Sequence, residues 1–254
     1  MPTIDVDYDE FERMLGIRLY RDSEKVNDVL AFVKGEMKLF DEKEGTMNVE
    51  IKDTNRPDVW NIEGMVRTLR GFLGLEEGLR EYTLGKQMAE VYVDRRLDDI
   101  RPYIGCSIAK NLKLTDRIIR GLMHMQDKLD QTYGRNRQKT SIGLYNLDLI
   151  KLPLQYTVAR PTEVSFVPLG FTEKMNLKQI LTRHPKGLEY GHIIDKHSMY
   201  PVLLDSDDKP LSFPPIINSN DLGRITEDTK NVLVEVTGTA NETVLNTVKI
   251  VTLS

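Results

Sequence analysis

The order of helix-like and strand-like segments is the feature that most constrains the fold of this chain. Apolar residues repeat with the period of a strand in "MNVEIKD" and "SIGLYNLDLI", and with the period of a helix in "TDRIIRGLMHMQDKLDQTYG". Thr115 and Gly134 predict the two ends of that last helix. The segments follow one another irregularly, and no internal repeat is present. This mixture predicts an α+β fold.

A glycine-containing, charged segment divides the chain. "GLEEGLREYTLGK" at 74–86 carries three glycines and charges of both signs. The chain is long enough for two modest domains. We therefore expect a small mixed α/β domain at 1–85, followed by a larger mixed-sheet domain at 86–254.

The last segment, 241–254, fits two structures. Its Val, Ile and Thr content favours a strand, whereas Val244, Leu245, Val248 and Val251 also fit one face of a helix. No Gly or Pro closes the segment, which is typical of a chain cut inside a larger protein. We expect the larger domain to be truncated at its C-terminal side.

The composition argues against several classes of protein. The chain is 40% hydrophobic and 29% charged, as in ordinary globular proteins, and its net charge of −4 argues against a generally basic nucleic-acid binder. No segment resembles a signal peptide, a transit peptide or a membrane span. Cys106 is the only cysteine, so no intrachain disulfide can form. We therefore expect a cytoplasmic protein with no membrane partner.

Familiar catalytic and cofactor motifs do not occur in the sequence. The four histidines stand in no metal-binding spacing, so we expect no metal site. There is no glycine-rich phosphate loop and no G-x-S-x-G nucleophile turn. Cys106 lies in the apolar run "YIGCSIA", which favours an inert core residue. Any catalysis would have to proceed without a standard nucleophile.

Two core-like segments nevertheless carry polar residues. "LSFPPIINSN" at 211–220 contains Ser212 and Asn218 on either side of two prolines, and "NVLVEVTGT" at 231–239 is a buried-type strand interrupted by Glu235. Turn chemistry is one explanation for Ser and Asn beside proline. The other explanation is a pocket that recognises a polar group, since a carboxylate among Val and Leu needs a partner.

Several motifs resemble, in order, the β subunit of archaeal and eukaryotic-type phenylalanyl-tRNA synthetases. "NRPDVWNIEGMVRTLRGFLG" is similar to the pattern N-R-P-D…E-G…R-x-L-R-G of that family's N-terminal domain. "GRNRQKTSIGLYNLDLI", "VSFVPLGF", "HPKGLEYG", "YPVLLDSDDKPLSFPPIINSND" and "TGTAN" resemble successive pieces of its editing region, the B3/4 domain. The resemblance covers essentially the whole chain.

This resemblance implies a B1-type domain at 1–85 and an incomplete B3/4 editing domain at 86–254. It also implies a complete subunit much longer than this chain, and it favours a helix at 241–254. The partners would be the catalytic α subunit, in an α2β2 heterotetramer, and tRNA(Phe), but not DNA. ATP and Mg²⁺ would serve the whole enzyme, and this part of it would hold no cofactor.

In such a family the editing site hydrolyses Tyr-tRNA(Phe) formed in error. An apolar pocket rejects an added hydroxyl by only about a hundredfold, whereas a site that hydrogen-bonds the hydroxyl discriminates far better. The resemblance assigns the tyrosine hydroxyl to Ser212, Glu235 and Thr237. It assigns the walls of the ring slot to Leu169 and Leu203. Relatives often carry Asp at the position of Glu235.

The resemblance also assigns residues to the reacting end of the substrate. Asn218, Gln126 and Asp127 would act at the ester, and Arg137 and Arg224 would bind ribose or phosphate. Relatives usually carry Glu at the position of Asp127. Without a nucleophile, we expect water to attack the ester, oriented by donors that stabilise the oxyanion, with assistance from the 3′-terminal ribose hydroxyl.

Two other functions stay open on the sequence. One is an RNA-docking and subunit-assembly module without activity of its own. The other is a free-standing hydrolase that edits in trans. For the isolated chain we expect little editing activity, together with dimerisation or disorder at its C-terminal end.

Overall fold

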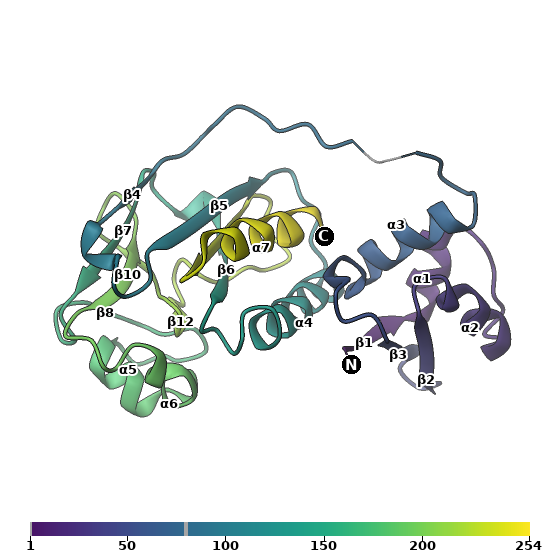
Figure 1. Cartoon of the computed structure of the whole chain (residues 1–254), viewed down its shortest axis with the longest axis horizontal. Coiled ribbons are helices and arrows are strands. Elements are labelled where there is room, and N and C mark those ends of the chain that lie inside the picture. The colour runs from purple at the N-terminus through teal and green to yellow at the C-terminus, as the bar shows by residue number, and fades with distance from the viewer. Residues whose placement is uncertain (1, 79–80) are drawn as a thin grey trace. The chain divides into compact units, whose positions relative to one another are not determined.

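The computed structural model describes residues 2–78 and 81–254, which form two compact units (Figure 1). Both units combine helices with sheets, which confirms the α+β prediction. Residues 79–80 of the predicted dividing segment lie outside the described residues. Unit 1 consists of Met1–Gly85, Arg120–Lys128 and Ser254, and unit 2 of Lys86–Ile119 and Leu129–Leu253.

Unit 1 is built on a three-stranded antiparallel sheet. Its elements are β1 (Thr3–Asp7), α1 (Tyr8–Leu15), α2 (Ser23–Ala31), β2 (Gly35–Asp41), β3 (Thr46–Ile51), the 3-10 helix η1 (Pro57–Val59) and α3 (Ile62–Phe72). The strand order is β1-β3-β2. In the central strand, Met47, Val49 and Ile51 are buried and alternate with more exposed residues, so β3 turns one face to the core.

Unit 2 contains two larger sheets, a small one and several helices. A five-stranded sheet has the order β12-β11-β10-β7-β4, and a three-stranded sheet has the order β5-β13-β6. The strands are β4 (Val91–Val93), β5 (Tyr103–Ala109), β6 (Thr140–Asn146), β7 (Leu154–Ala159), β8 (Ser165–Phe166), β9 (Met175–Asn176), β10 (Tyr200–Leu204), β11 (Pro210–Phe213), β12 (Ile217–Asn218) and β13 (Val232–Gly238).

The helices that follow residue 86 do not all belong to one unit. α4 contributes residues to both units, whereas the others belong to unit 2. The α-helices are α4 (Asp116–Gln131), α5 (Leu177–Arg183), α6 (Pro185–Tyr190) and α7 (Asn241–Leu253), and the 3-10 helices are η2 (Arg95–Leu97), η3 (Leu147–Leu149) and η4 (Gly191–Ile193). The Thr115 hydroxyl accepts a hydrogen bond from the Ile118 N–H, which confirms the predicted start of α4.

β13 is the central strand of the three-stranded sheet, and its two faces differ. Because side chains alternate, Leu233, Glu235 and Thr237 share one face, and three valines share the other. α7 covers the valine face (Figure 1). Gly105 of β5 lies directly beneath α7, since a Cβ there would come within 3.0 Å of Val248.

The other face of β13 packs on the five-stranded sheet. Leu233 and Tyr145 from the three-stranded sheet join Tyr156 and Leu203 from the five-stranded sheet in one apolar cluster. The far face of the five-stranded sheet packs on α5 and α6 in a second cluster. The layers of unit 2 are therefore α7, three strands, five strands, and α5 with α6.

The segment 241–254 forms the helix α7, which confirms the helical alternative. Val244, Val248 and Val251 are buried as predicted. Leu245 is 45% exposed but also reaches the sheet, since a Cβ on Gly105 would lie 3.7 Å from its Cδ2, and Thr247 is buried as well. The hydroxyl of Thr247 donates to the Thr243 carbonyl, so its burial leaves no unpaired donor.

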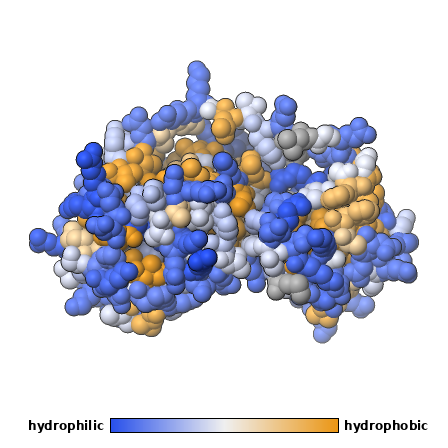
Figure 2. Space-filling view, in the orientation of Figure 1, coloured by the Kyte–Doolittle hydropathy of each residue, from blue (hydrophilic) through white to orange (hydrophobic). Residues whose placement is uncertain are grey.

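Hydrophilic side chains cover most of the face seen in Figure 2, with apolar side chains in smaller groups. Within residues 2–78 and 81–254, no helix is both long and apolar enough to cross a membrane.

Candidate functional site

The polar face of β13 places two predicted site residues inside unit 2. Glu235 is 2% exposed and Thr237 is fully buried. In the sheet Glu235 is paired with Cys106 and Gly143, and Thr237 is paired with Ile104 and Ser141. Both polar side chains therefore point from a central strand towards the five-stranded sheet.

Three further predicted residues lie on the facing sheet. Leu203 of β10 pairs with Ser212 of β11, and Ser212 pairs with Asn218 of β12. Directly opposed residues share a face, so these side chains form one row across the sheet. Leu169 lies beside the end of this row, because its N–H donates to the Asn218 carbonyl at 2.9 Å. The fold thus brings together predicted site residues as far apart in the sequence as Leu169 and Thr237, which are separated by 68 positions.

Tyr145 of β6 connects the two sheets and was not singled out in the sequence. Its hydroxyl donates to Glu235 Oε2 at 2.8 Å and lies 3.3 Å from Asn218 Oδ1. Gly143 allows this arrangement, because a Cβ there would come within 2.3 Å of the Tyr145 hydroxyl oxygen. The small residue at 143 in "SIGLYNLDLI" is the only local signal, and it acquires meaning only when the strand pairing is known.

Two polar atoms of this cluster are buried and lack a hydrogen-bond partner among the described residues. They are Ser212 Oγ and Glu235 Oε1. Ser212 lies close enough to Tyr145 to help lower the pKa of the Tyr145 phenol, and Thr237 lies close enough to Glu235 to help lower the pKa of the Glu235 carboxyl. Neither Ser212 Oγ nor Glu235 Oε1, however, has a partner in the described residues at the geometry of a good hydrogen bond. Such atoms cost about 1–3 kcal/mol each, so they mark a place where a ligand group can be bound favourably.

Burial governs the protonation of this cluster. Desolvation raises the pKa of Glu235 to about 7, although the hydrogen bond from Tyr145 and the positive charge of Arg101 act in the opposite direction. Burial also raises the pKa of the Tyr145 hydroxyl well above its ordinary value. At neutral pH Tyr145 is therefore a neutral donor, and the protonated and ionised forms of Glu235 are both populated.

Arg101 binds Thr237 and Ser141 beside the cluster, and this role was not predicted from the sequence. Its guanidinium donates to the Thr237 hydroxyl at 3.0 Å, the Thr237 carbonyl at 2.7 Å and the Ser141 hydroxyl at 3.1 Å. The side chain is fully buried, and burial lowers its pKa. Arg101 fixes the Thr237 side chain and supplies positive charge near Glu235.

Comparison with known proteins identifies the family. The phenylalanine–tRNA ligase β subunit of Pyrococcus horikoshii is 42% identical over 247 residues, which are 96% of this chain and 44% of that protein. The corresponding subunit of Thermococcus gammatolerans is 43% identical over 240 residues, which are 94% of this chain and 42% of that protein.

A solved structure agrees with the relatives. The crystal structure of an N-terminal fragment of the Pyrococcus horikoshii phenylalanyl-tRNA synthetase β subunit superposes with a TM-score of 0.94 at 40% identity, covering 99% of this chain and 72% of that one. The chain belongs to the phenylalanyl-tRNA synthetase β-subunit family. It spans less than half the length of the curated relatives. No protein-family model matches it.

The two arginines that this family resemblance assigns to the nucleic acid differ in their surroundings. Arg137 is 8% exposed, forms an ion pair with Asp130 at 2.9 Å and donates to the Pro215 and Ile216 carbonyls. Its guanidinium holds the turn before Asn218, and phosphate binding would require it to exchange these internal partners.

Arg224 is exposed and makes no hydrogen bond or ion pair with any residue that the structure describes. It follows Gly223, where a Cβ would come within 2.4 Å of the Asn218 Cβ. This close packing places the Arg224 backbone next to Asn218. A free guanidinium beside the predicted ester site suits the phosphate role predicted for it.

Gln126 and Asp127 are the two predicted ester residues that lie on a helix. Both lie on α4 in the stretch Arg120–Lys128, which belongs to unit 1, whereas the cluster belongs to unit 2. Gln126 is partly buried and Asp127 is exposed. Their role at the ester stays a prediction from the family resemblance.

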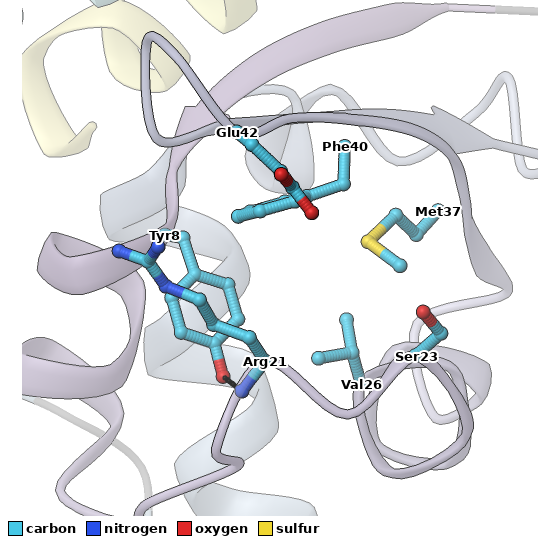
Figure 3. A pocket seen from close by; sticks show the side chains of 7 residues that line it. All are labelled: Tyr8, Arg21, Ser23, Val26, Met37, Phe40 and Glu42. Carbon is cyan, nitrogen blue, oxygen red and sulfur yellow. Dashed lines mark hydrogen bonds between the residues drawn. The ribbon is translucent and has the colours of Figure 1, made fainter.

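Among the described residues, no group of three or more His, Cys, Asp and Glu side chains could hold a metal ion. A depression of about 560 Å³ lies in unit 1, far in sequence from the cluster (Figure 3). Tyr8, Val26, Met37 and Phe40 give it apolar walls, and the Glu42 carboxylate faces its interior. None of the predicted site residues lines it.

Proposed function

We propose that unit 2 is the editing region of a phenylalanyl-tRNA synthetase and that it hydrolyses Tyr-tRNA(Phe). The observation that carries this proposal is a pair of buried atoms, Ser212 Oγ and Glu235 Oε1, that have no hydrogen-bond partner among the described residues and lie beside the apolar cluster between the two sheets. Family membership supports it, since the synthetase of this family must distinguish phenylalanine from tyrosine.

A phenol hydroxyl is complementary to these two atoms. It donates one hydrogen bond and accepts others, so it can donate to Glu235 and accept from Ser212. A phenylalanine ring in the same place would leave both atoms unpaired, at a cost of about 1–3 kcal/mol each. Leu203 lies next to Ser212 in the sheet and offers an apolar wall that either ring could contact.

The reacting end of the substrate would lie towards Asn218 and Leu169, which are both partly exposed. Asn218 would bind the ester or the attacking water, and Arg224 would bind a phosphate of the acceptor end. Burial raises the pKa of the Cys106 thiol well above its ordinary value, so this residue is a poor nucleophile. Water is therefore the attacking group in this proposal.

The whole synthetase would supply what this chain does not. The α subunit would charge tRNA(Phe) with phenylalanine, using ATP and Mg²⁺, in a cytoplasmic α2β2 assembly. Ester hydrolysis by water needs no cofactor in the editing region itself. Residues 1–85 would form the B1-type domain, and residues 86–254 would form the B3/4-type domain.

Deacylation of purified Tyr-tRNA(Phe) tests the proposal. It would be measured with this chain alone and with a full-length β subunit that carries the chain at its N-terminus, assembled with its α subunit. We expect faster hydrolysis of Tyr-tRNA(Phe) than of Phe-tRNA(Phe) in the assembled enzyme. Equal hydrolysis of the two, or none of either, would favour an assembly module without editing activity. Full activity of the chain alone would favour a free-standing hydrolase.

A further inference from the structure

We infer that Tyr145 is a positioning residue that sets the specificity of the proposed editing site, because its hydroxyl holds one oxygen of Glu235 and leaves the other for the substrate. This inference rests on the proposed function. It adds a role for a residue that lies on β6, away from both segments that first indicated a polar pocket.

The geometry divides the two oxygens of Glu235 between two tasks. Oε2 accepts from the Tyr145 hydroxyl at 2.8 Å, while Oε1 is buried without a partner among the residues that the structure describes. A phenol has one proton, so Tyr145 commits it to the nearer acceptor, Glu235, rather than to Asn218 Oδ1 at 3.3 Å. The carboxylate group is thereby held in one orientation.

Tyr145 itself is held firmly. It is fully buried, and its ring and hydroxyl occupy the space above Gly143, the sheet partner of Glu235. The hydroxyl therefore cannot leave the carboxylate without a movement of the whole ring. A fixed donor of this kind orients an acceptor more precisely than solvent can.

Tyr145 also favours the charged form of Glu235. The hydrogen bond lowers the pKa of this carboxyl, against the effect of burial. Without it, more of Glu235 would be protonated at neutral pH, and a protonated acid accepts a substrate hydroxyl less well. The other titratable or charged groups that influence this pKa or are influenced by Glu235 are Arg101, Cys106, Asp130 and Tyr156. Among these, only Arg101 is positively charged.

The test compares Tyr145→Phe with Tyr156→Phe in the assembled synthetase. Both variants lose one hydroxyl from the same buried cluster, but the Tyr156 hydroxyl donates to the Arg101 carbonyl at 2.8 Å and not to Glu235. For Tyr145→Phe we expect roughly a tenfold loss of selectivity for Tyr-tRNA(Phe) over Phe-tRNA(Phe) at pH 7, which corresponds to one hydrogen bond of about 1.4 kcal/mol. Selectivity should recover as the pH is raised. Tyr156→Phe should keep the selectivity and pH profile of the parent.

A second measurement does not depend on editing. Carbon-13 NMR of the Glu235 carboxyl in the 254-residue chain should show a higher pKa in Tyr145→Phe and no change in Tyr156→Phe. If Tyr145→Phe does not fold, 3-fluorotyrosine at position 145 keeps the ring and donates more strongly, so it should lower the Glu235 pKa.

The outcomes separate the two proposals. An assembled parent enzyme that does not prefer Tyr-tRNA(Phe) refutes the editing function, and with it the specificity role of Tyr145. A selective parent whose Tyr145→Phe variant keeps its selectivity and pH profile refutes the inference alone. An unchanged Glu235 pKa in the same variant would do so as well.

Discussion

Each unit of this molecule contains a tyrosine that donates a hydrogen bond to a glutamate, and the two pairs differ in what remains unsatisfied. In unit 1 the Tyr8 hydroxyl donates to Glu12 at 2.8 Å, and in unit 2 the Tyr145 hydroxyl donates to Glu235 at the same distance. The contact is identical in kind, but the surroundings give it opposite consequences.

The carboxylate of unit 1 is occupied by the protein itself. Glu12 also accepts hydrogen bonds from the backbone N–H groups of Leu19 and Tyr20, and the Tyr8 hydroxyl accepts from the Arg21 N–H. Burial acts to raise the pKa of Glu12, but these hydrogen bonds outweigh it and the pKa is lowered. The three hydrogen bonds to Glu12 all reach Oε1, and they tie the loop that contains Leu19 and Tyr20 to α1.

The carboxylate of unit 2 is only half satisfied. Burial dominates there and raises the pKa of Glu235 to about 7, and one oxygen has no partner in the described part of the chain. Glu12 is only partly buried and its contacts hold a loop, whereas Glu235 is 2% exposed with one oxygen unpaired among the described residues, and a buried acid with such an open oxygen is a candidate for function.

The two parts of the sequence also differ in charge. Residues 1–85 carry 12 Lys and Arg and 19 Asp and Glu, a net charge of −7. Residues 86–254 carry 23 and 20, a net charge of +3. The overall charge of −4 therefore comes from the first part, and the second part is slightly positive.

The largest effect is expected at Asn218, the predicted donor to the ester in unit 2. Asn218→Ala should slow deacylation of Tyr-tRNA(Phe) by roughly 10²–10³-fold, as for the loss of an oxyanion donor. Asn27→Ala in unit 1, which removes an acceptor of the Met37 N–H, should leave the rate unchanged. A loss below about threefold for Asn218→Ala would make this residue a turn residue only.

The two glutamates should respond oppositely to pH. The folded pKa of Glu235 is raised, so its contribution to stability is most favourable below pH 4.5 and falls as the pH rises from 4.5 to about 7, by about 3 kcal/mol in total. The folded pKa of Glu12 is lowered, so its contribution is present above pH 4.5 and lost as the pH falls below it.

Urea unfolding of Glu235→Gln and Glu12→Gln across this range checks the prediction. The first variant should flatten the decline of the free energy of unfolding between pH 4.5 and 7. The second should lose stability mainly at neutral pH. If the free energy of unfolding of both variants depends on pH as that of the parent does, the opposite pKa shifts of Glu12 and Glu235 are wrong.

Crowding at Gly143 offers a smaller effect. Gly143→Ala puts a Cβ against the Tyr145 hydroxyl and should lower the free energy of unfolding by about 1–3 kcal/mol. The matched change is Gly121→Ala in α4, where a Cβ meets nothing within 4 Å and should stabilise the helix by up to about 1 kcal/mol. Equal stability of the two variants would show that the Tyr145 ring is not held against Gly143.

Ser212 should give the smallest change in stability, and its sign is informative. Because its hydroxyl is buried without a partner in the residues described, Ser212→Ala should raise the free energy of unfolding by about 1 kcal/mol. The same variant should lose roughly tenfold in selectivity for Tyr-tRNA(Phe). A loss of stability with unchanged selectivity would identify Ser212 as an ordinary packing residue.

The sequence could indicate some of this site because polar residues in apolar segments are visible locally. Ser212, Asn218 and Glu235 stand out in "LSFPPIINSN" and "NVLVEVTGT" without any knowledge of the fold. Apolar periodicity likewise predicts the strands β3 and β6, but it left 241–254 open between a strand and the helix α7, which only the family resemblance favoured.

Other features depend on contacts between distant segments. In the sequence Tyr145 looks like an ordinary core residue. Its role becomes visible only when β6 is paired with β13, because its partner Glu235 lies 90 positions away. Arg101 and Arg137 stand in charged, turn-like segments but are buried by partners as far as 136 and 79 positions away. Local patterns carry no information about such partners, so these roles could not be predicted.

The central claim is that Ser212 and Glu235 bind a phenol hydroxyl, and a crystal structure of the chain with bound tyrosine tests it most directly. The account predicts the tyrosine ring beside Leu203, with its hydroxyl oxygen within about 2.6–3.2 Å of both Glu235 Oε1 and Ser212 Oγ. Tyr145 should still contact Glu235 Oε2. A tyrosine bound with its hydroxyl in solvent, or bound only outside unit 2, would contradict the account.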